Sequence, residues 1–133
     1  MMVCVELPII LPSVANMREH WAKRAQRAKN QRIVSRLALT AKVKGMSLPC
    51  AVTLTRIAPR QLDGDNLQSA FKSIRDGIAD ALGVDDRDSR IEWKYLQEKR
   101  RCREFAVRMK IEETPTPFGN TQVGTTRFVN SGG

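Results

Sequence analysis

The order of apolar and polar residues predicts alternating strands and helices from the start of the chain. Val, Ile and Leu dominate residues 2–10, and Pro8 and Pro12 close this run, which predicts a short strand followed by a turn. Residues 14–44 contain no Pro or Gly, and their apolar spacing predicts a long helix that ends before Gly45. The expected apolar stripe of this helix consists of Trp21, Ala25, Ala28, Ile33, Leu37 and Ala41.

A second strand and a second helix follow. Residues 48–57 are rich in β-branched and apolar residues, which predicts a strand. Apolar residues recur at helical spacing over residues 66–82, and Gly83 stands where the helix should end. Asp65 with Gln68 three residues later has the form of a capping box, so we expect Asp65 to be the N-cap.

Two further segments alternate between apolar and polar residues. The alternation over 91–95 and over 105–111 predicts a hairpin closed over residues 98–103. The element order β-α-β-α-β-β predicts a single α/β (α+β) domain with a mixed sheet flanked by helices. We expect this domain to span residues 1–113, and the Pro-, Gly- and Thr-rich residues 114–133 to form a flexible C-terminal tail.

The charge points to a polyanionic partner. The chain has 133 residues, with 23 Lys plus Arg against 14 Asp plus Glu, a net charge of +9 and a pI of about 10.1. Such a surplus favours nucleic acid first and an anionic membrane surface second. The basic residues gather in 18–44 and 99–103, where the alternative is a merely solvated face. Our candidates for DNA contact are Lys23, Arg24, Arg27, Arg32, Arg100 and Arg101. We expect Trp21 and Trp93 to belong to the core.

Acidic residues concentrate on both sides of the second predicted helix. Asp63 and Asp65, with Asn66 beside them, precede it, and Asp85 and Asp86 follow it. An acidic cluster in a basic protein opposes nucleic-acid binding unless a cation neutralises it, and carboxylates bind Mg²⁺ or Mn²⁺. If the two segments converge, they form a divalent-metal site able to act on a phosphodiester.

Other interpretations of these acids stay open or are excluded. Each acidic pair by itself is also typical of a turn or a helix cap. An EF-hand is excluded, because the loop that begins at Asp63 lacks the acid, the glycine and the glutamate that such a site needs at its fifth, sixth and twelfth positions. There is no Gly-rich phosphate loop and no nucleophile elbow, and His20 is the only histidine, which disfavours triad chemistry.

The cysteines favour a reducing compartment. Their spacing fits neither a zinc knuckle nor a redox motif, so we expect free core thiols at Cys4, Cys50 and Cys102. No stretch near the start fits a signal peptide or a membrane span, which makes cytoplasmic the expected location.

Three short motifs lie between residues 63 and 91. They are Asp63-x-Asp65-Asn66, then Lys72-x-x-x-Asp76-Gly77-Ile78, then Asp85-Asp86 with Ile91 following. This set resembles the RusA family of Holliday junction resolvases over roughly residues 3–112. The opening 11–14, Leu-Pro-Ser-Val, with Asn16 and basic residues after it, is also similar to that family.

The resemblance implies a small homodimer, common in phages and prophages, that binds four-way DNA junctions and makes paired symmetric nicks with Mg²⁺ or Mn²⁺ in DNA recombination and repair. Carried over by position, Asp63, Asp65 and Asp86 are the metal-binding carboxylates, with Asp85 as a neighbour. Lys72 matches the lysine that stabilises charge on the scissile phosphate.

One spacing differs from the family pattern. The family lysine follows the Asn after two residues, whereas five residues separate Asn66 from Lys72, and Ser69 stands at the usual place. Three extra residues are nearly one helical turn, which keeps Lys72 on about the same face, about 4.5 Å further along. Arg75 is a possible substitute for Lys72. The competing hypothesis is a non-catalytic protein on the same scaffold that binds DNA structures.

Overall fold

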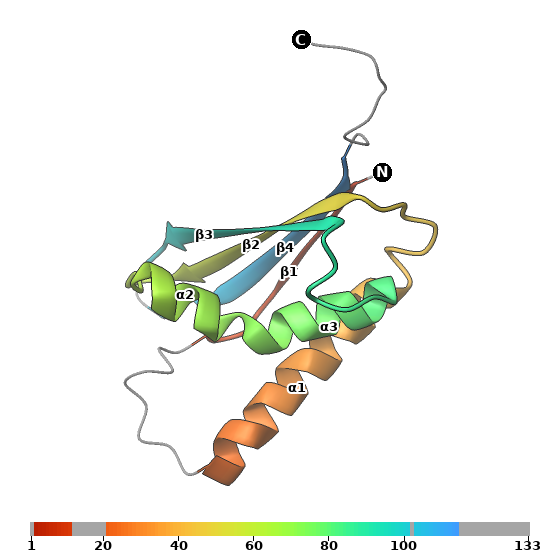
Figure 1. Ribbon diagram of the computed structural model, residues 1–133. Coiled ribbons are helices and arrows are strands. Elements are labelled where there is room, and N and C mark those ends of the chain that lie inside the picture. Colours follow the sequence, from red (N-terminus) through yellow and green to blue (C-terminus); the bar gives the residue numbers. More distant parts are fainter. Residues whose placement is uncertain (1, 12–20, 102, 115–133) are drawn as a thin grey trace, which may run out of the picture.

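Four strands form one mixed sheet in the order β1-β4-β2-β3 (Figure 1). The computed structural model describes residues 2–11, 21–101 and 103–114. The strands are β1 (Met2–Leu7), β2 (Cys50–Ala58), β3 (Ile91–Lys99) and β4 (Ala106–Glu113). β2 pairs with β3 in parallel, and β4 pairs antiparallel with both β1 and β2. The predicted α+β domain with a mixed sheet is therefore confirmed.

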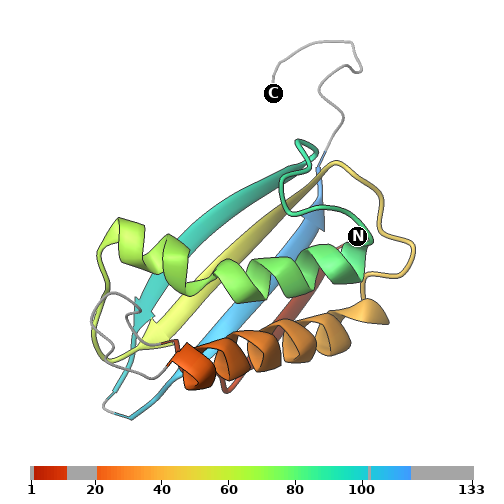
Figure 2. The ribbon, with the colours of Figure 1, turned by 60° about the horizontal axis from the view of Figure 1, so that its bottom comes forward.

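The helices of the described residues all lie on one face of this sheet, and α1 and α3 run side by side across it (Figures 1 and 2). They are α1 (Trp21–Thr40), α2 (Gly64–Ala70) and α3 (Lys72–Leu82). The prediction of helices flanking the sheet is too broad, because among the described residues one face of the sheet carries no helix. None of these helices has the length and apolarity that a bilayer span requires.

The predicted hairpin between the last two strands is wrong. β3 and β4 do not pair with each other, because β2 lies between them, with Leu54 opposite Tyr95 on one side and Met109 on the other. Eight of the nine residues of β2 are buried, as expected for a strand with neighbours on both edges. Alternation along β3 and β4 shows which side chains share a face, but does not determine which strands are neighbours.

The second predicted helix is two helices. Phe71 separates α2 from α3 with a backbone at φ −88° and ψ −1°, and its side chain is fully buried. The N-cap of α2 is Asp63 rather than Asp65, and its side chain makes no capping hydrogen bond. Gly83 does end α3, at φ 75°, a left-handed conformation that favours glycine.

The buried side of α1 also differs from the predicted stripe. Ser35 and Leu39 are fully buried, whereas Leu37 is 66% exposed and Trp21 is 74% exposed. The expectation of Trp21 in the core is therefore wrong. Several residues of the predicted stripe are alanines that stand between basic residues, so the sequence did not determine which side of α1 is buried. The residue of α3 that packs against α1 determines it.

That residue is Gly77. A Cβ at this position would clash with the backbone oxygen of Arg32 and would lie 2.9 Å from the Cβ of Ser35. Only glycine therefore allows α3 to approach α1 so closely. Arg32 also donates two hydrogen bonds to Asp80, at 2.7 and 3.0 Å, and so joins the same two helices at the surface. The basic helix is thus fixed to the helix that carries Lys72.

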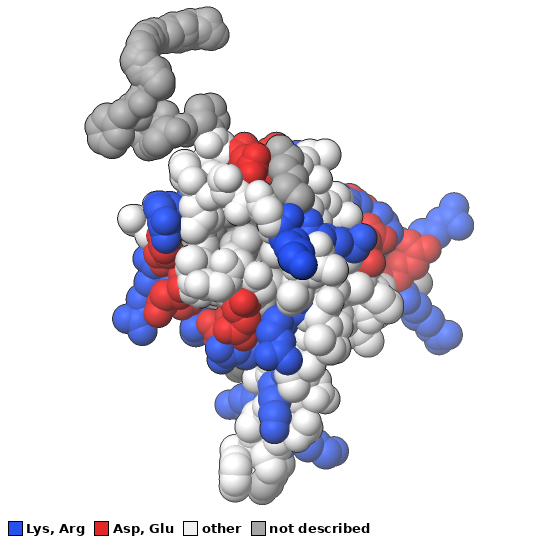
Figure 3. All heavy atoms as spheres, turned by 90° about the vertical axis from the view of Figure 1, so that its right-hand side faces the viewer, with Lys and Arg blue, Asp and Glu red and all other residues white. Residues whose placement is uncertain are grey.

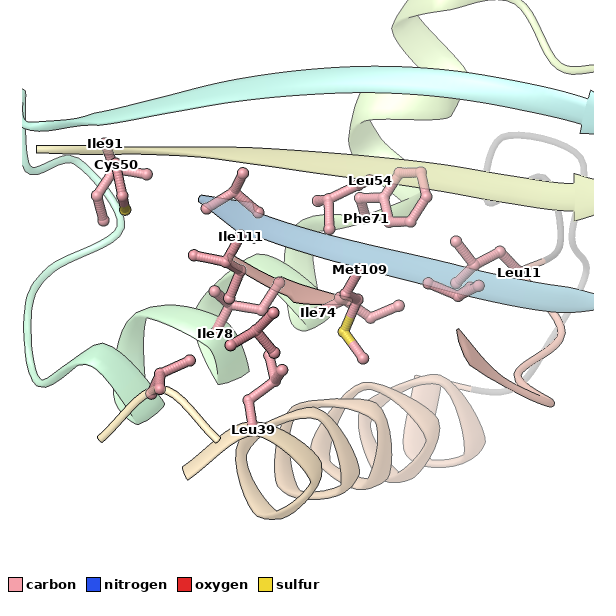
Figure 4. Close-up of a cluster of buried hydrophobic side chains, with 14 of the residues drawn as sticks. Leu11, Leu39, Cys50, Leu54, Phe71, Ile74, Ile78, Ile91, Met109 and Ile111 are labelled. Carbon is pink, nitrogen blue, oxygen red and sulfur yellow. The ribbon is translucent and has the colours of Figure 1, made fainter. Parts of the chain in front are cut away.

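The hydrophobic core lies between the helices and the sheet (Figure 4). Phe71, Ile74 and Ile78 of α2–α3 and Leu39 of α1 are fully buried there. The strands contribute further buried side chains, among them Val52, Leu54, Val107, Met109 and Ile111. Burying each such side chain stabilises the fold by about 1.5–3 kcal/mol, which positions the helices that carry the acidic residues.

The cysteines of the described residues differ from each other. Cys50 is buried in β2 as expected, and burial raises the pKa of its thiol. Cys4 is exposed, so it is not a core thiol. Cys102 and the expected tail over residues 115–133 lie outside the described residues, as do Asn16, His20 and most of the opening motif.

Candidate functional site

The first acidic pair stands at the start of α2. The loop before it is fixed to β3, because the Leu62 backbone N–H donates to Gln97 Oε1 and Gln97 Nε2 donates to the Leu62 oxygen, both at 2.8 Å. Asp63 and Asp65 are exposed. Among the described residues, neither carboxylate has a hydrogen bond or an ion pair with another side chain. Both are therefore open to a cation from solution.

The second acidic pair lies in the loop between α3 and β3. This loop turns back along α3 before it enters β3 (Figure 1), which brings Asp86 to the start of that helix. The backbone oxygen of Asp86 accepts hydrogen bonds from Trp93 Nε1 at 3.0 Å and from Arg75 Nη2 at 3.3 Å. The position of Asp86 is thus set by side chains of β3 and α3 together.

The Asp86 carboxylate faces two cations. Its Oδ2 lies 3.4 Å from Lys72 Nζ and 3.4 Å from Arg75 Nη2, and the side chain is 16% exposed. Burial raises the pKa of Asp86, but Lys72, a hydrogen bond with the Asp85 side chain and the charge of Arg75 together lower it by more, so this pKa lies below its usual value. Asp86 is therefore held as a carboxylate between positive groups.

Lys72 connects a carboxylate of α3, Asp76, with the loop carboxylate Asp86. Its ammonium donates to Asp76 Oδ1 at 2.9 Å, one turn along α3, and makes the longer contact with Asp86. The hydrogen bond to Asp76 and the charges of Asp76 and Asp86 raise the pKa of Lys72 against a smaller effect of burial. Because the Lys72 side chain is 63% exposed, its ammonium can still reach an incoming anion.

Arg75, which the sequence offered only as a possible substitute for Lys72, makes contacts that the sequence did not indicate. Its guanidinium lies 4.7 Å from the centre of the Trp93 ring, and Nη1 donates to the Tyr95 hydroxyl at 2.8 Å. Tyr95 in turn packs on Phe71, with ring centres 5.9 Å apart. A stacked, hydrogen-bonded guanidinium is well fixed. The alternation of Trp93 and Tyr95 on β3 was the only available signal, and it does not identify their partner.

Asp85 stabilises a turn, which is one of the alternative interpretations of the acidic pairs. It is exposed, and its Oδ1 accepts the backbone N–H of Arg87 at 2.8 Å, which is an Asx turn. Asp88 repeats the arrangement with Arg90, whose side chain lowers the Asp88 pKa to about 2. These contacts stabilise the bend that returns the loop to α3.

The sequence made a divalent-metal site conditional on convergence of the two acidic segments, and in the part of the chain that the structure describes no contact joins them. Among the described residues, no group of three or more Asp, Glu, His or Cys side chains could hold a metal ion, and no contact joins Asp63 or Asp65 to Asp86. The physical reason is the direction of the loop. Asp86 arrives beside Lys72 at the start of α3, whereas Asp63 and Asp65 stand at the start of α2.

The candidate DNA-contact residues fall into two groups. Arg32 pairs with Asp80, and Arg100 pairs with Glu98 and Glu6, so these two arginines stabilise the fold. The others lie on exposed or half-exposed surface: Lys23, Arg24 and Arg27 near the start of α1, and Arg101 after β3. On the side of the molecule shown in Figure 3, acidic and basic side chains lie next to each other rather than in separate regions.

The comparisons with known proteins add a relative but no function. No protein-family model matches this chain. Over 82 residues it is 42% identical to an uncharacterized protein of Xylella fastidiosa (strain Temecula1 / ATCC 700964). The match covers 54% of this chain and 52% of that protein, so the chain spans about half the length of this relative.

Proposed function

We propose that this protein is a Mg²⁺-dependent, structure-selective endodeoxyribonuclease that resolves four-way DNA junctions by paired symmetric nicks. The observation that carries the proposal is that two exposed carboxylates and a lysine lie on one short helical run, α2–α3. Asp63 and Asp65 begin the run, and Lys72, placed between Asp76 and Asp86, begins its second helix. A carboxylate pair and an exposed ammonium are the groups that phosphodiester chemistry requires.

The residues present fit a divalent cation in part. Asp63 and Asp65 offer exposed oxygen ligands with no competing partner among the described residues, and Mg²⁺ is commonly held by one or two carboxylates together with water and phosphate. A bound Mg²⁺ supplies polarisation of a phosphoryl oxygen. The third ligand implied by the family resemblance, Asp86, faces Lys72 and Arg75 instead.

The remaining groups have separate tasks in this proposal. Lys72 donates to the phosphate and stabilises the charge that develops on it. Asp86, fixed by Arg75 and Trp93, keeps the Lys72 ammonium at the start of α3. Arg24 and Arg27 on α1 contact the DNA backbone without reading its sequence. Two copies of the chain, related by symmetry, cut the two opposed strands.

The second candidate is a non-catalytic protein that binds branched DNA. The observation that favours it is the pairing of Asp86 with two cations, which competes with a role as metal ligand. In this case DNA binding is sensitive to salt, and no strand is cut in the presence of metal.

A nicking assay separates the two candidates. Wild-type protein and Asp65→Asn are incubated with a mobile four-way junction or with linear duplex, in Mg²⁺, in Mn²⁺ or in EDTA. The nuclease proposal expects paired cuts in the junction that require metal and Asp65, and none in the duplex. Junction binding without metal-dependent cuts by the wild type supports the non-catalytic candidate, and cleavage by folded Asp65→Asn contradicts the assignment of Asp65.

A further inference from the structure

A small hollow lies between α1 and the α2–α3 run, next to the part of α2 that comes after Asp65. Its volume is about 180 Å³. Ligand pockets for drug-sized molecules measure about 300–1,000 Å³, so this hollow suits one small group rather than a whole nucleotide. The residues that line it are Leu11, Arg24, Arg27, Ala28, Gln31, Ser69, Ala70 and Ser73.

The lining combines apolar surface with residues whose side chains can donate hydrogen bonds. These residues are Arg24, Arg27 and Gln31 of α1 and, on the opposite side, Ser69 of α2 and Ser73 of α3. No acidic residue is among the lining residues that the structure describes. Guanidinium and hydroxyl donors around a small space are the groups that contact phosphate oxygens in DNA complexes.

A second hollow of similar size provides the contrast. It measures about 170 Å³ and is lined by Asp76, Asp80, Asp85 and Asp86, with Arg32. Arg32 is already paired with Asp80 there, so this second hollow repels an anion. Of these two hollows, the one lined by Ser69 and Ser73 is therefore the one whose charge suits a phosphate.

The basic hollow also lies close to the acidic pair. Ser69 follows Asp65 by four residues, and such positions on a helix lie on one face, with about 5–6 Å between Cβ atoms. Ser73 is one turn further and directly follows Lys72. A phosphate in the hollow would therefore sit beside the carboxylate that we assign to the reaction.

We propose that this hollow binds a backbone phosphate of the DNA, adjacent to the phosphate that is cut, through Arg24, Arg27 and the hydroxyls of Ser69 and Ser73. The inference rests on the proposed function for the identity of the ligand. It extends that function by naming where the DNA strand is fixed relative to Asp65. The site positions the strand and takes no part in bond cleavage.

The test measures binding of the full chain to a fluorescein-labelled four-way junction in EDTA, by anisotropy over a range of salt concentrations. Two matched pairs of variants separate a local effect from a general change of charge. Ser69→Glu adds a carboxylate in the hollow, and Gln68→Glu adds one beside it on α2. Arg24→Gln removes a guanidinium from the hollow, and Arg36→Gln removes an exposed one elsewhere on α1.

Ser69→Glu and Arg24→Gln are expected to weaken binding about fivefold at 0.15 M salt, because one neutralised phosphate contributes about −0.9 to the slope of log affinity against log salt. The slope itself should shrink by about that amount in Arg24→Gln, whereas Gln68→Glu and Arg36→Gln should lose less than twofold. Equal losses within both pairs overturn the proposed phosphate site.

The arginine pair decides the question if Ser69→Glu does not fold, since Arg24 and Arg36 are both exposed on one helix. If the wild type binds the junction but never cuts it, the nuclease proposal is contradicted. The phosphate site is not contradicted by that result, because the binding assay contains no metal.

Discussion

The helices α2 and α3 are separated by a single residue, Phe71, but the acidic groups at their two starts lie in opposite surroundings. Asp63 and Asp65 at the first start are exposed and have no ion pair with the described residues. At the second start, Asp86 lies between Lys72 and Arg75. The same type of side chain therefore has two tasks. An unpaired carboxylate can bind a metal ion from solution, whereas a paired carboxylate positions the basic side chain that it already contacts.

The largest expected difference between the two groups is in catalysis. Asp65→Asn should lower junction cleavage at least a hundredfold, the scale on which the loss of one electrostatic catalytic group is measured. Asp86→Asn should lower it only about tenfold, because Lys72 remains on α3 and keeps its contact with Asp76. Single-turnover rates at saturating Mg²⁺ measure both effects. Equal losses would show that the two carboxylates act together.

A glycine-to-alanine pair tests whether the middle of α3 packs closely on α1 while the start of α2 does not. Gly77→Ala should destabilise the protein by about 1–3 kcal/mol, because its Cβ meets the Arg32 backbone and α1 must move. Gly64→Ala at the start of α2 meets nothing within 4 Å and should change the free energy of unfolding little. Urea denaturation measures both values. A stable Gly77→Ala protein would contradict the close crossing of α1 and α3.

Arg75→Met tests how Asp86 is held. The variant removes the guanidinium from Trp93, Tyr95 and Asp86, and we expect about tenfold slower cleavage, because a hydrogen bond to a charged group stabilises by about 1.5–3 kcal/mol. In a Trp21→Phe background, the emission of Trp93 should also shift to longer wavelength as its ring becomes accessible to water. Slower cleavage with unchanged emission would place the effect of Arg75 elsewhere.

The smallest expected effect is on stability in acid. A carboxyl whose pKa is lowered by folding contributes stability above its unfolded pKa of about 3.9, and this contribution is lost as the pH falls through the folded pKa. The difference in unfolding free energy between wild type and Asp86→Asn should therefore shrink between about pH 5 and pH 2. We expect it to be below about 1 kcal/mol, and smaller in 1 M salt, because Lys72 is exposed. A difference that grows in acid would contradict the pairing of Asp86.

Sequence patterns predicted the strands and the end of α3 well, because these depend on neighbouring residues. The alternation on β3 and the left-handed conformation at Gly83 are examples. The sequence did not reveal that β2 separates β3 from β4, because pairing is decided by the whole sheet. It also assigned the buried side of α1 incorrectly, since that side is set by the contact between Ser35 and Gly77.

For the candidate site, the sequence indicated residues but not geometry. The acidic residue types, together with the family resemblance, singled out Asp63, Asp65, Lys72 and Asp86, whose roles stay a prediction. Their spacing along the chain could not show that the loop after α3 turns back toward Lys72, because this depends on Arg75 and Trp93 holding the backbone oxygen of Asp86. A shared partner of that kind leaves no periodic signal in a sequence.

The most direct test of the different tasks of the two acidic groups is a Mn²⁺ titration of the ¹⁵N-labelled full chain, followed by NMR. Paramagnetic Mn²⁺ broadens the amide signals nearest to it. Our account predicts that residues 63–66 broaden first and that residues 85–88 keep their signals at the same Mn²⁺ concentration. Broadening of residues 85–88 first, or of both segments together, would contradict it and would make Asp86 a metal ligand.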